Sequence, residues 1–155
     1  MIKTAEGMEI RPMIAEDMLW VIEHGVKEYG LKCYPNDHMR ELALARENNG
    51  KCITGLVDGN IVGVGGMDEM WTGVGEVWLM LSYETDKYPK RAYKVIRDGL
   101  KKLIEDNGFW RTQAWGRMDF DRAHTLFKHL GFKPEGIARK YTPDGVDAIL
   151  YAKVE

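Results

Sequence analysis

One stretch, residues 76–103, constrains the fold most, because its apolar pattern changes period within a few residues. Residues 76–83 (EVWLMLSY) are rich in apolar and aromatic side chains, which is typical of a buried strand. From Pro89 onward the apolar residues fall at helical spacing, with charged residues between them: Tyr93, Ile96, Leu100 and Leu103. Proline suits the first turn of a helix, where its missing N–H is not needed. The pattern therefore predicts a strand that leads through a tight polar connection into a long amphipathic helix.

The junction between this strand and this helix is a candidate anion site. Backbone N–H groups in the first turn of a helix have no intrahelical partner and point toward the preceding loop. Lys87, Lys90 and Arg91 surround that point in the sequence. A basic run alone is usually a solvated helix face, so the argument depends on where this run lies. We therefore expect a phosphate-bearing ligand to meet the chain here.

The length and charge of the chain narrow its class. At 155 residues we expect a single domain over residues 1–155. A net charge of −2 argues against a general attraction to nucleic acid, and no apolar run approaches the ~20 residues that span a membrane. The two cysteines and four histidines show no metal-ligand spacing. We expect a cytoplasmic, metal-free protein; the sequence leaves the oligomeric state, including a homodimer, open.

The remaining segments complete an alternating order of strands and helices. They predict a strand over residues 8–13, a helix from Ala15 to Gly30, a helix ending near residue 50, strands over 51–57, 61–70 and 109–115, a helix ending at Gly131, and strands over 132–141 and 146–154. Gly63, Gly65 and Gly66 lie inside one strand, where glycine is expected only if a backbone or ligand approaches closely. The order β-α-α-β-β-β-α-β-α-β-β predicts an α+β fold: a mixed, mostly antiparallel sheet, helices on both faces and one parallel crossover.

This order and several segments resemble the GNAT superfamily of acyl-CoA-dependent N-acetyltransferases, over nearly the whole chain. Residues 10–17 (IRPMIAED) are similar to its opening strand and helix, and residues 58–63 (DGNIVG) to its second hairpin. Residues 123–136 (AHTLFKHLGFKPEG) are similar to the helix and strand that close the cofactor site, which is the most specific match. The resemblance implies a GNAT-like fold, acetyl-CoA as cosubstrate, and transfer of its acetyl group to a small-molecule or protein amine.

The resemblance also implies which residues bind the pantetheine arm of acetyl-CoA. In the family, the strand before the long helix parts from its neighbour, and its backbone pairs with pantetheine. Carried over to this sequence, the backbone donors and acceptors are those of Met80, Leu81 and Ser82. Phe127 lies on the helix that closes the same site.

The turn that follows this strand binds pyrophosphate in the family, through the pattern Gln/Arg-x-x-Gly-x-Gly/Ala. Here Lys87 takes the first position, Lys90 replaces the first glycine, and Ala92 is the final small residue. A side chain in place of glycine puts a Cβ where the backbone approaches phosphate. Lys90 and Arg91 could offset part of that loss as point charges.

A base is needed because an amine with a pKa of ~10.4 must lose a proton before it attacks a thioester. Glu76 heads the strand where histone-acetylating members of the family keep their base, so it is the first candidate. Asp68 and Glu69, at the end of the preceding strand, are alternatives. Each of the three is also explained as a solvated residue at a strand end.

Three departures from the family leave a second function open. Phe127 replaces the tyrosine that protonates the leaving thiolate in many members, and Phe120 replaces a common asparagine. Tyr83 or Tyr88 could supply the lost hydroxyl, although each is also explained by packing. A turn without glycines also looks like the GNAT-like proteins of tailed bacteriophages. The alternative is a catalytically degenerate GNAT-fold protein that serves as a binding or assembly module, in a phage particle.

Overall fold

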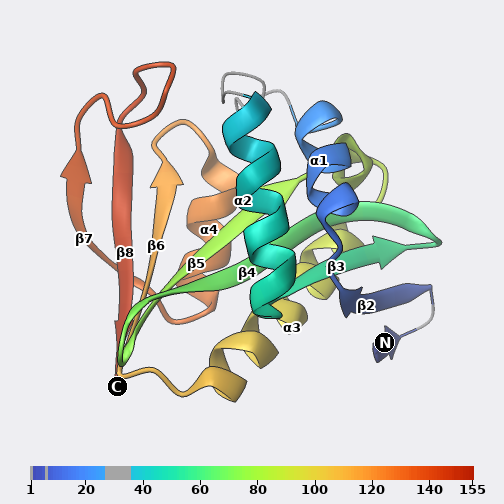
Figure 1. The fold of residues 1–155 in the computed structure, drawn as a ribbon, viewed down its shortest axis with the longest axis horizontal. Coiled ribbons are helices and arrows are strands. Elements are labelled where there is room, and N and C mark those ends of the chain that lie inside the picture. Colours follow the sequence, from blue (N-terminus) through green and yellow to red (C-terminus); the bar gives the residue numbers. More distant parts are fainter. Residues whose placement is uncertain (1, 6, 27–35) are drawn as a thin grey trace.

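A computed structural model describes residues 2–5, 7–26 and 36–155, and within them the strands form one eight-stranded sheet in the order β1-β2-β3-β4-β5-β6-β8-β7. The strands are β1 (Ile2–Ala5), β2 (Met8–Pro12), β3 (Cys52–Val57), β4 (Asn60–Trp71), β5 (Val74–Leu81), β6 (Arg111–Arg117), β7 (Lys133–Ala138) and β8 (Ala148–Val154). The helices are α1 (Ala15–Glu23), α2 (Asn36–Asn49), α3 (Pro89–Asn107) and α4 (Asp121–His129), with a short 3-10 helix η3 (Tyr83–Asp86). Helices α1 and α2 cover one face of the sheet, and α3 and α4 the other (Figure 1).

This architecture confirms the predicted α+β fold. Every neighbouring pair of strands is antiparallel except β5 and β6, which are parallel and are joined through the long helix α3. The sequence pattern missed β1, which pairs with β2 at one edge of the sheet. The predicted strand over residues 132–141 was too long, because β7 ends at Ala138.

The first helix was also predicted too long. Helix α1 ends at Glu23, and the predicted end at Gly30 lies outside the described residues. After the helix, the Val26 N–H donates to the Leu81 carbonyl at 3.1 Å, and the Tyr83 N–H donates to the His24 carbonyl at 2.9 Å. These bonds draw the backbone out of the helix and along the end of β5. Val26 is buried as its spacing predicted, but it reaches the core from extended backbone.

The glycines of β4 confirm the predicted close approach of other chain segments. A Cβ on Gly66 would lie 2.7 Å from the Lys51 carbonyl oxygen, and one on Gly63 would lie 2.9 Å from the Met80 carbonyl oxygen. A Cβ on Gly65 would meet the Leu100 side chain of α3 at 3.1 Å. Because these positions lack side chains, α3 packs closely on the sheet and begins beside the end of β5.

A buried ion pair joins β2 to the start of α1. Two Asp17–Arg11 hydrogen bonds of 2.6 and 2.9 Å are joined by bonds from the Ile14 N–H and the Thr54 hydroxyl, and Asp17 is 5% exposed. Burial raises the pKa of Asp17, but the hydrogen bonds from Arg11, Ile14 and Thr54 outweigh burial and hold that pKa below its ordinary value. The carboxylate is therefore the hub of this corner of the fold.

Replacing Asp17 with asparagine is expected to lower the free energy of unfolding at pH 7 by about 2–3 kcal/mol, because the Arg11 guanidinium loses its charged partner. A lowered pKa in the folded protein stabilises above the unfolded-state pKa of ~3.9, and this contribution is lost as the pH falls through the folded-state pKa. Urea unfolding at a series of pH values measures both effects. A difference between the two proteins that stays constant down to pH 2 would contradict this role.

Candidate active site

The two parallel strands separate part of the way along their length. β5 and β6 pair over four residue pairs, from Val74 with Arg111 to Val77 with Ala114. Beyond that point β5 continues to Leu81 and β6 to Arg117 without pairing to each other. Figure 1 shows the two strands diverging from the lower left of the view. The fold therefore has a wedge-shaped opening at the predicted place.

Two cavities adjoin this opening and share Leu79 of β5 and Ala123 of α4. The first has a volume of about 360 Å³, and its lining includes Trp115, Gly116 and Arg117 of β6, Phe120, Phe127, and residues 141–143. The second has a volume of about 250 Å³ and lies between the first halves of α3 and α4; its lining includes Leu81, Thr85, Pro89, Ala92 and Arg122. Together they form a channel that runs from the start of α3 to the loop between β7 and β8.

The backbone groups that face the opening belong to Leu79 and Leu81. Ser82 donates its N–H to the Val62 carbonyl of β4 at 2.9 Å. Because backbone groups alternate sides along a strand, those of Met80 also face β4, whereas those of Leu79 and Leu81 face the β6 side. The Leu81 carbonyl accepts the Val26 N–H there. Of the three predicted pantetheine-binding residues, the geometry favours Leu81 over Met80 and Ser82, and it adds Leu79.

Among the residues predicted to bind pyrophosphate, Ala92 lines the second cavity and the other three lie outside it. The Lys87 ammonium is 3.5 Å from the Glu84 carboxylate. Arg91 makes two hydrogen bonds of 3.0 Å to Asp58, in the turn between β3 and β4. Lys90 is exposed on the first turn of α3. The predicted basic cluster therefore exists, but two of its three members are held by carboxylates.

Of the three carboxylates considered as bases, Glu76 is held by a neutral group. Its Oε1 accepts a hydrogen bond of 3.0 Å from the Gln113 side chain of β6, and Glu76 is half-buried beside the point where the strands separate. Asp68, its cross-strand neighbour on β4, accepts a 2.8 Å hydrogen bond from Arg46.

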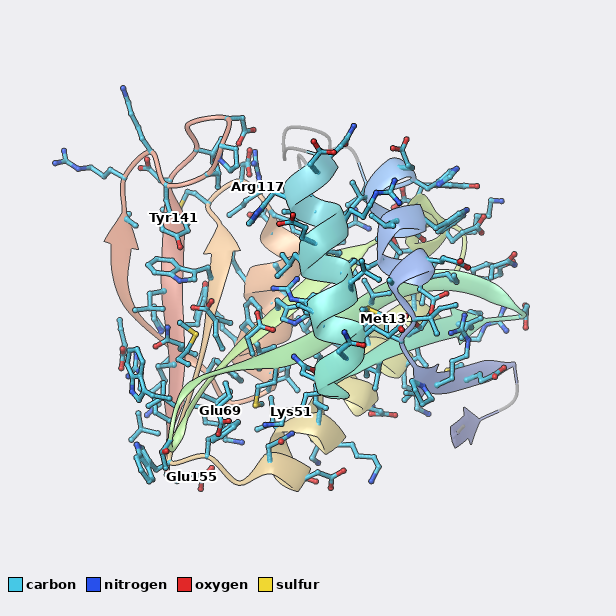
Figure 2. The ribbon with its side chains drawn as sticks, viewed as in Figure 1. Met13, Lys51, Glu69, Arg117, Tyr141 and Glu155 are labelled. Carbon is cyan, nitrogen blue, oxygen red and sulfur yellow. The ribbon has the colours of Figure 1, made fainter. Side chains whose placement is uncertain are left out.

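Glu69 lies apart from the two cavities. Its carboxylate is 3.8 Å from the Lys51 ammonium. Figure 2 shows Glu69 and Lys51 at one end of the sheet and Arg117 and Tyr141 near the other. The arrangement therefore favours Glu76 as the base, and the role of each of these carboxylates stays a prediction.

The tyrosine that lines the first cavity is Tyr141, which the sequence interpretation missed. Its ring stacks on Trp115 with centroids 4.4 Å apart, and Phe127 lines the same cavity. Burial, and then the negative charge of Glu76, raise the pKa of Tyr141, so its hydroxyl stays protonated at neutral pH. Tyr141 has no family motif around it, and only the folded structure brings it to β6.

The two tyrosines predicted from sequence lie elsewhere. The Tyr83 ring lies beside Trp20 and His24, with centroids 6.2 and 6.0 Å away, and lines neither cavity. The Tyr88 hydroxyl accepts a hydrogen bond of 3.2 Å from Asn60. The acid role of Tyr83 stays a prediction, and the geometry favours Tyr141.

An ion-pair network fixes the loop that carries Tyr141. Arg117 bonds Asp144 at 2.7 and 3.0 Å, and these bonds hold the pKa of Asp144 below its ordinary value. The Gly145 N–H donates to the Thr142 carbonyl at 2.9 Å, which confirms the predicted turn. The loop is thereby tied to the end of β6, so Tyr141 has a defined position over the first cavity.

Two further searches cover residues 2–5, 7–26 and 36–155. No histidines, cysteines or carboxylates in these ranges are grouped so that they could hold a metal ion. None of the helices there has the length and apolar character that a membrane crossing requires.

Sequence comparison finds no matching family model and no matching curated protein. Structural comparison finds GNAT-family acetyltransferases. Ard1 from Thermoplasma volcanium matches with a TM-score of 0.75 and 19% identity over 96% of this chain and 97% of that one. An acetyltransferase of the GNAT family from Bacillus anthracis matches with a TM-score of 0.70 and 17% identity over 99% and 98%. The yncA protein from Salmonella typhimurium, with its cofactor acetyl-CoA, matches with a TM-score of 0.70 and 13% identity over 96% and 94%. The chain has the fold of these acetyltransferases.

Proposed function

We propose that the chain is an acetyl-CoA-dependent N-acetyltransferase that acts on a small-molecule or protein amine. The separation of β5 from β6 beyond Val77 carries the proposal, because it opens an extended channel beside the start of a long helix. A structural neighbour with acetyl-CoA bound supports the choice of cosubstrate. The channel fits an extended arm, since Leu79 and Leu81 turn backbone groups toward it and the small side chains of Ala92 and Ala123 line it.

In this proposal acetyl-CoA supplies the acetyl thioester, and two side chains move protons. Glu76 accepts, directly or through water, the proton that the attacking amine loses as its nitrogen bonds the acetyl carbon. Tyr141 donates its phenolic proton to the sulfur as the carbon–sulfur bond breaks. Phe127 keeps the cavity wall apolar behind them, since it cannot take part in proton transfer. Exchange with water then restores both groups.

Replacing Tyr141 with phenylalanine is expected to lower kcat about tenfold and to leave KM for acetyl-CoA unchanged. The loss is modest because a thiolate with a pKa of ~8.5 can also take a proton from water. Thiol release with a reactive amine measures both constants. Tyr83→Phe is the matched control and should behave as the unmodified protein. The opposite result, a loss only in Tyr83→Phe, would assign the acid to Tyr83.

Calorimetric titration with acetyl-CoA, followed by thiol release across a panel of amines, tests the proposed function. Binding together with acetyl transfer to at least one amine is expected. No heat and no thermal shift at millimolar acetyl-CoA would overturn the enzyme and favour the alternative, a degenerate GNAT-fold binding or assembly module.

A further inference from the structure

An ion pair crosses the end of the second cavity at which α3 and α4 begin. Arg122, in the first turn of α4, places Nη1 3.0 Å from the Asp86 carboxylate and 3.4 Å from the Thr85 hydroxyl. Thr85, Arg122 and the first residue of α3, Pro89, all line this cavity. The bridge therefore connects the turn before α3 to the start of α4, across the end of the channel.

The bridge suits a reversible contact. The side chains of Arg122 and Asp86 are 43% and 66% exposed, and an ion pair this exposed contributes little to folding. Its two ends belong to segments 36 residues apart in sequence. Breaking it therefore costs the fold little, yet it releases a guanidinium and a carboxylate at the end of the channel that carries the phosphates of a bound cofactor in our proposal.

We propose that Arg122 binds a phosphate oxygen of coenzyme A, and that Asp86 occupies the same guanidinium when no phosphate is present; this rests on the proposed function. Carboxylate and phosphate oxygens accept the same charge-assisted hydrogen bonds from a guanidinium, so only one of them can hold a given N–H group at a time. Asp86 is then a competitor built into the chain. Arg122 also supplies, from α4, a phosphate contact in place of those lost with the glycine at position 90 of the family pattern.

Two single substitutions separate the two partners. Asp86→Asn removes the competitor and is expected to tighten coenzyme A binding about fivefold, whereas Arg122→Gln removes the ligand and is expected to weaken binding about tenfold. General changes in surface charge would act in the same directions, so each substitution needs a matched control. Asp106→Asn breaks the exposed Lys102–Asp106 pair at the other end of α3, and Arg40→Gln removes an exposed arginine from α2.

The combined variant Asp86→Asn/Arg122→Gln distinguishes competition from a general field. If Asp86 acts by occupying Arg122, the gain from Asp86→Asn disappears when Arg122 is already absent. If Asp86 only repels phosphate through space, the gain is the same in both backgrounds. Titration calorimetry with coenzyme A at low ionic strength, where charge effects are least screened, measures the four affinities.

We expect Asp86→Asn to give the fivefold gain in the otherwise unmodified protein, no gain when it is added to Arg122→Gln, and unchanged affinities in the two controls. Equal gains in both backgrounds, or wild-type affinity in Arg122→Gln, would overturn the competition while leaving coenzyme A binding intact. Absence of heat from all four proteins, with unchanged melting temperatures, would instead overturn the proposed function and this inference with it.

Discussion

Glu76→Gln is expected to lower kcat for amine acetylation by about 100-fold or more, because the amide cannot accept the proton that the attacking amine must lose. The substitution keeps the shape of the side chain and an oxygen that can accept the Gln113 hydrogen bond. Affinity for acetyl-CoA should therefore stay the same. Initial rates of thiol release, together with calorimetric affinities, separate the two effects.

The pH profile gives a second readout of Glu76→Gln. The fraction of neutral amine rises with pH toward its pKa of ~10.4, so the deficit of the variant should shrink at high pH. Glu69→Gln is the control, since that carboxylate is 49% exposed and pairs with Lys51. A full rate in Glu76→Gln, or an equal loss in Glu69→Gln, would remove Glu76 from the mechanism.

Ala123→Leu is expected to weaken acetyl-CoA binding about 100-fold or more, because a larger side chain fills the space where the two cavities meet. Ala123 is 4% exposed and lines both cavities, so added carbon atoms extend into the channel. Binding is measured by calorimetry, and a thermal melt shows whether the variant folds.

The control for Ala123→Leu is the same change at Ala45, which is exposed on α2, on the other face of the sheet. Ala45→Leu should bind acetyl-CoA as the unmodified chain does. A folded Ala123→Leu protein with unchanged affinity would show that the cofactor arm does not pass between the cavities.

Much of the fold could be predicted from sequence because local patterns and tertiary packing agree in most segments. The switch of period at Pro89 predicted β5 and α3, and the glycines of β4 predicted close packing. The end of α1 could not be predicted. Val26 continues the helical spacing of apolar residues, but its N–H bonds the Leu81 carbonyl of a strand far away in sequence.

The candidate site was predicted in place but not in detail. Residues 76–92 contain the separation of the strands and the start of α3, as expected. Which backbone groups face the opening depends on the pairing of β5 with β4, which the sequence does not specify. Tyr141, Gln113 and Arg122 were missed because each reaches the site from a distant segment: a loop, a neighbouring strand and the start of α4.

An amide-resolved NMR titration with coenzyme A tests most directly whether the separated strands hold the cofactor. We predict that the largest shifts occur at the amides of Leu79, Leu81 and Ala92 and at Gly116 and Ala123, with little change along β2 and β3. Shifts confined to residues outside the two cavities, or none at millimolar coenzyme A, would contradict the proposed site.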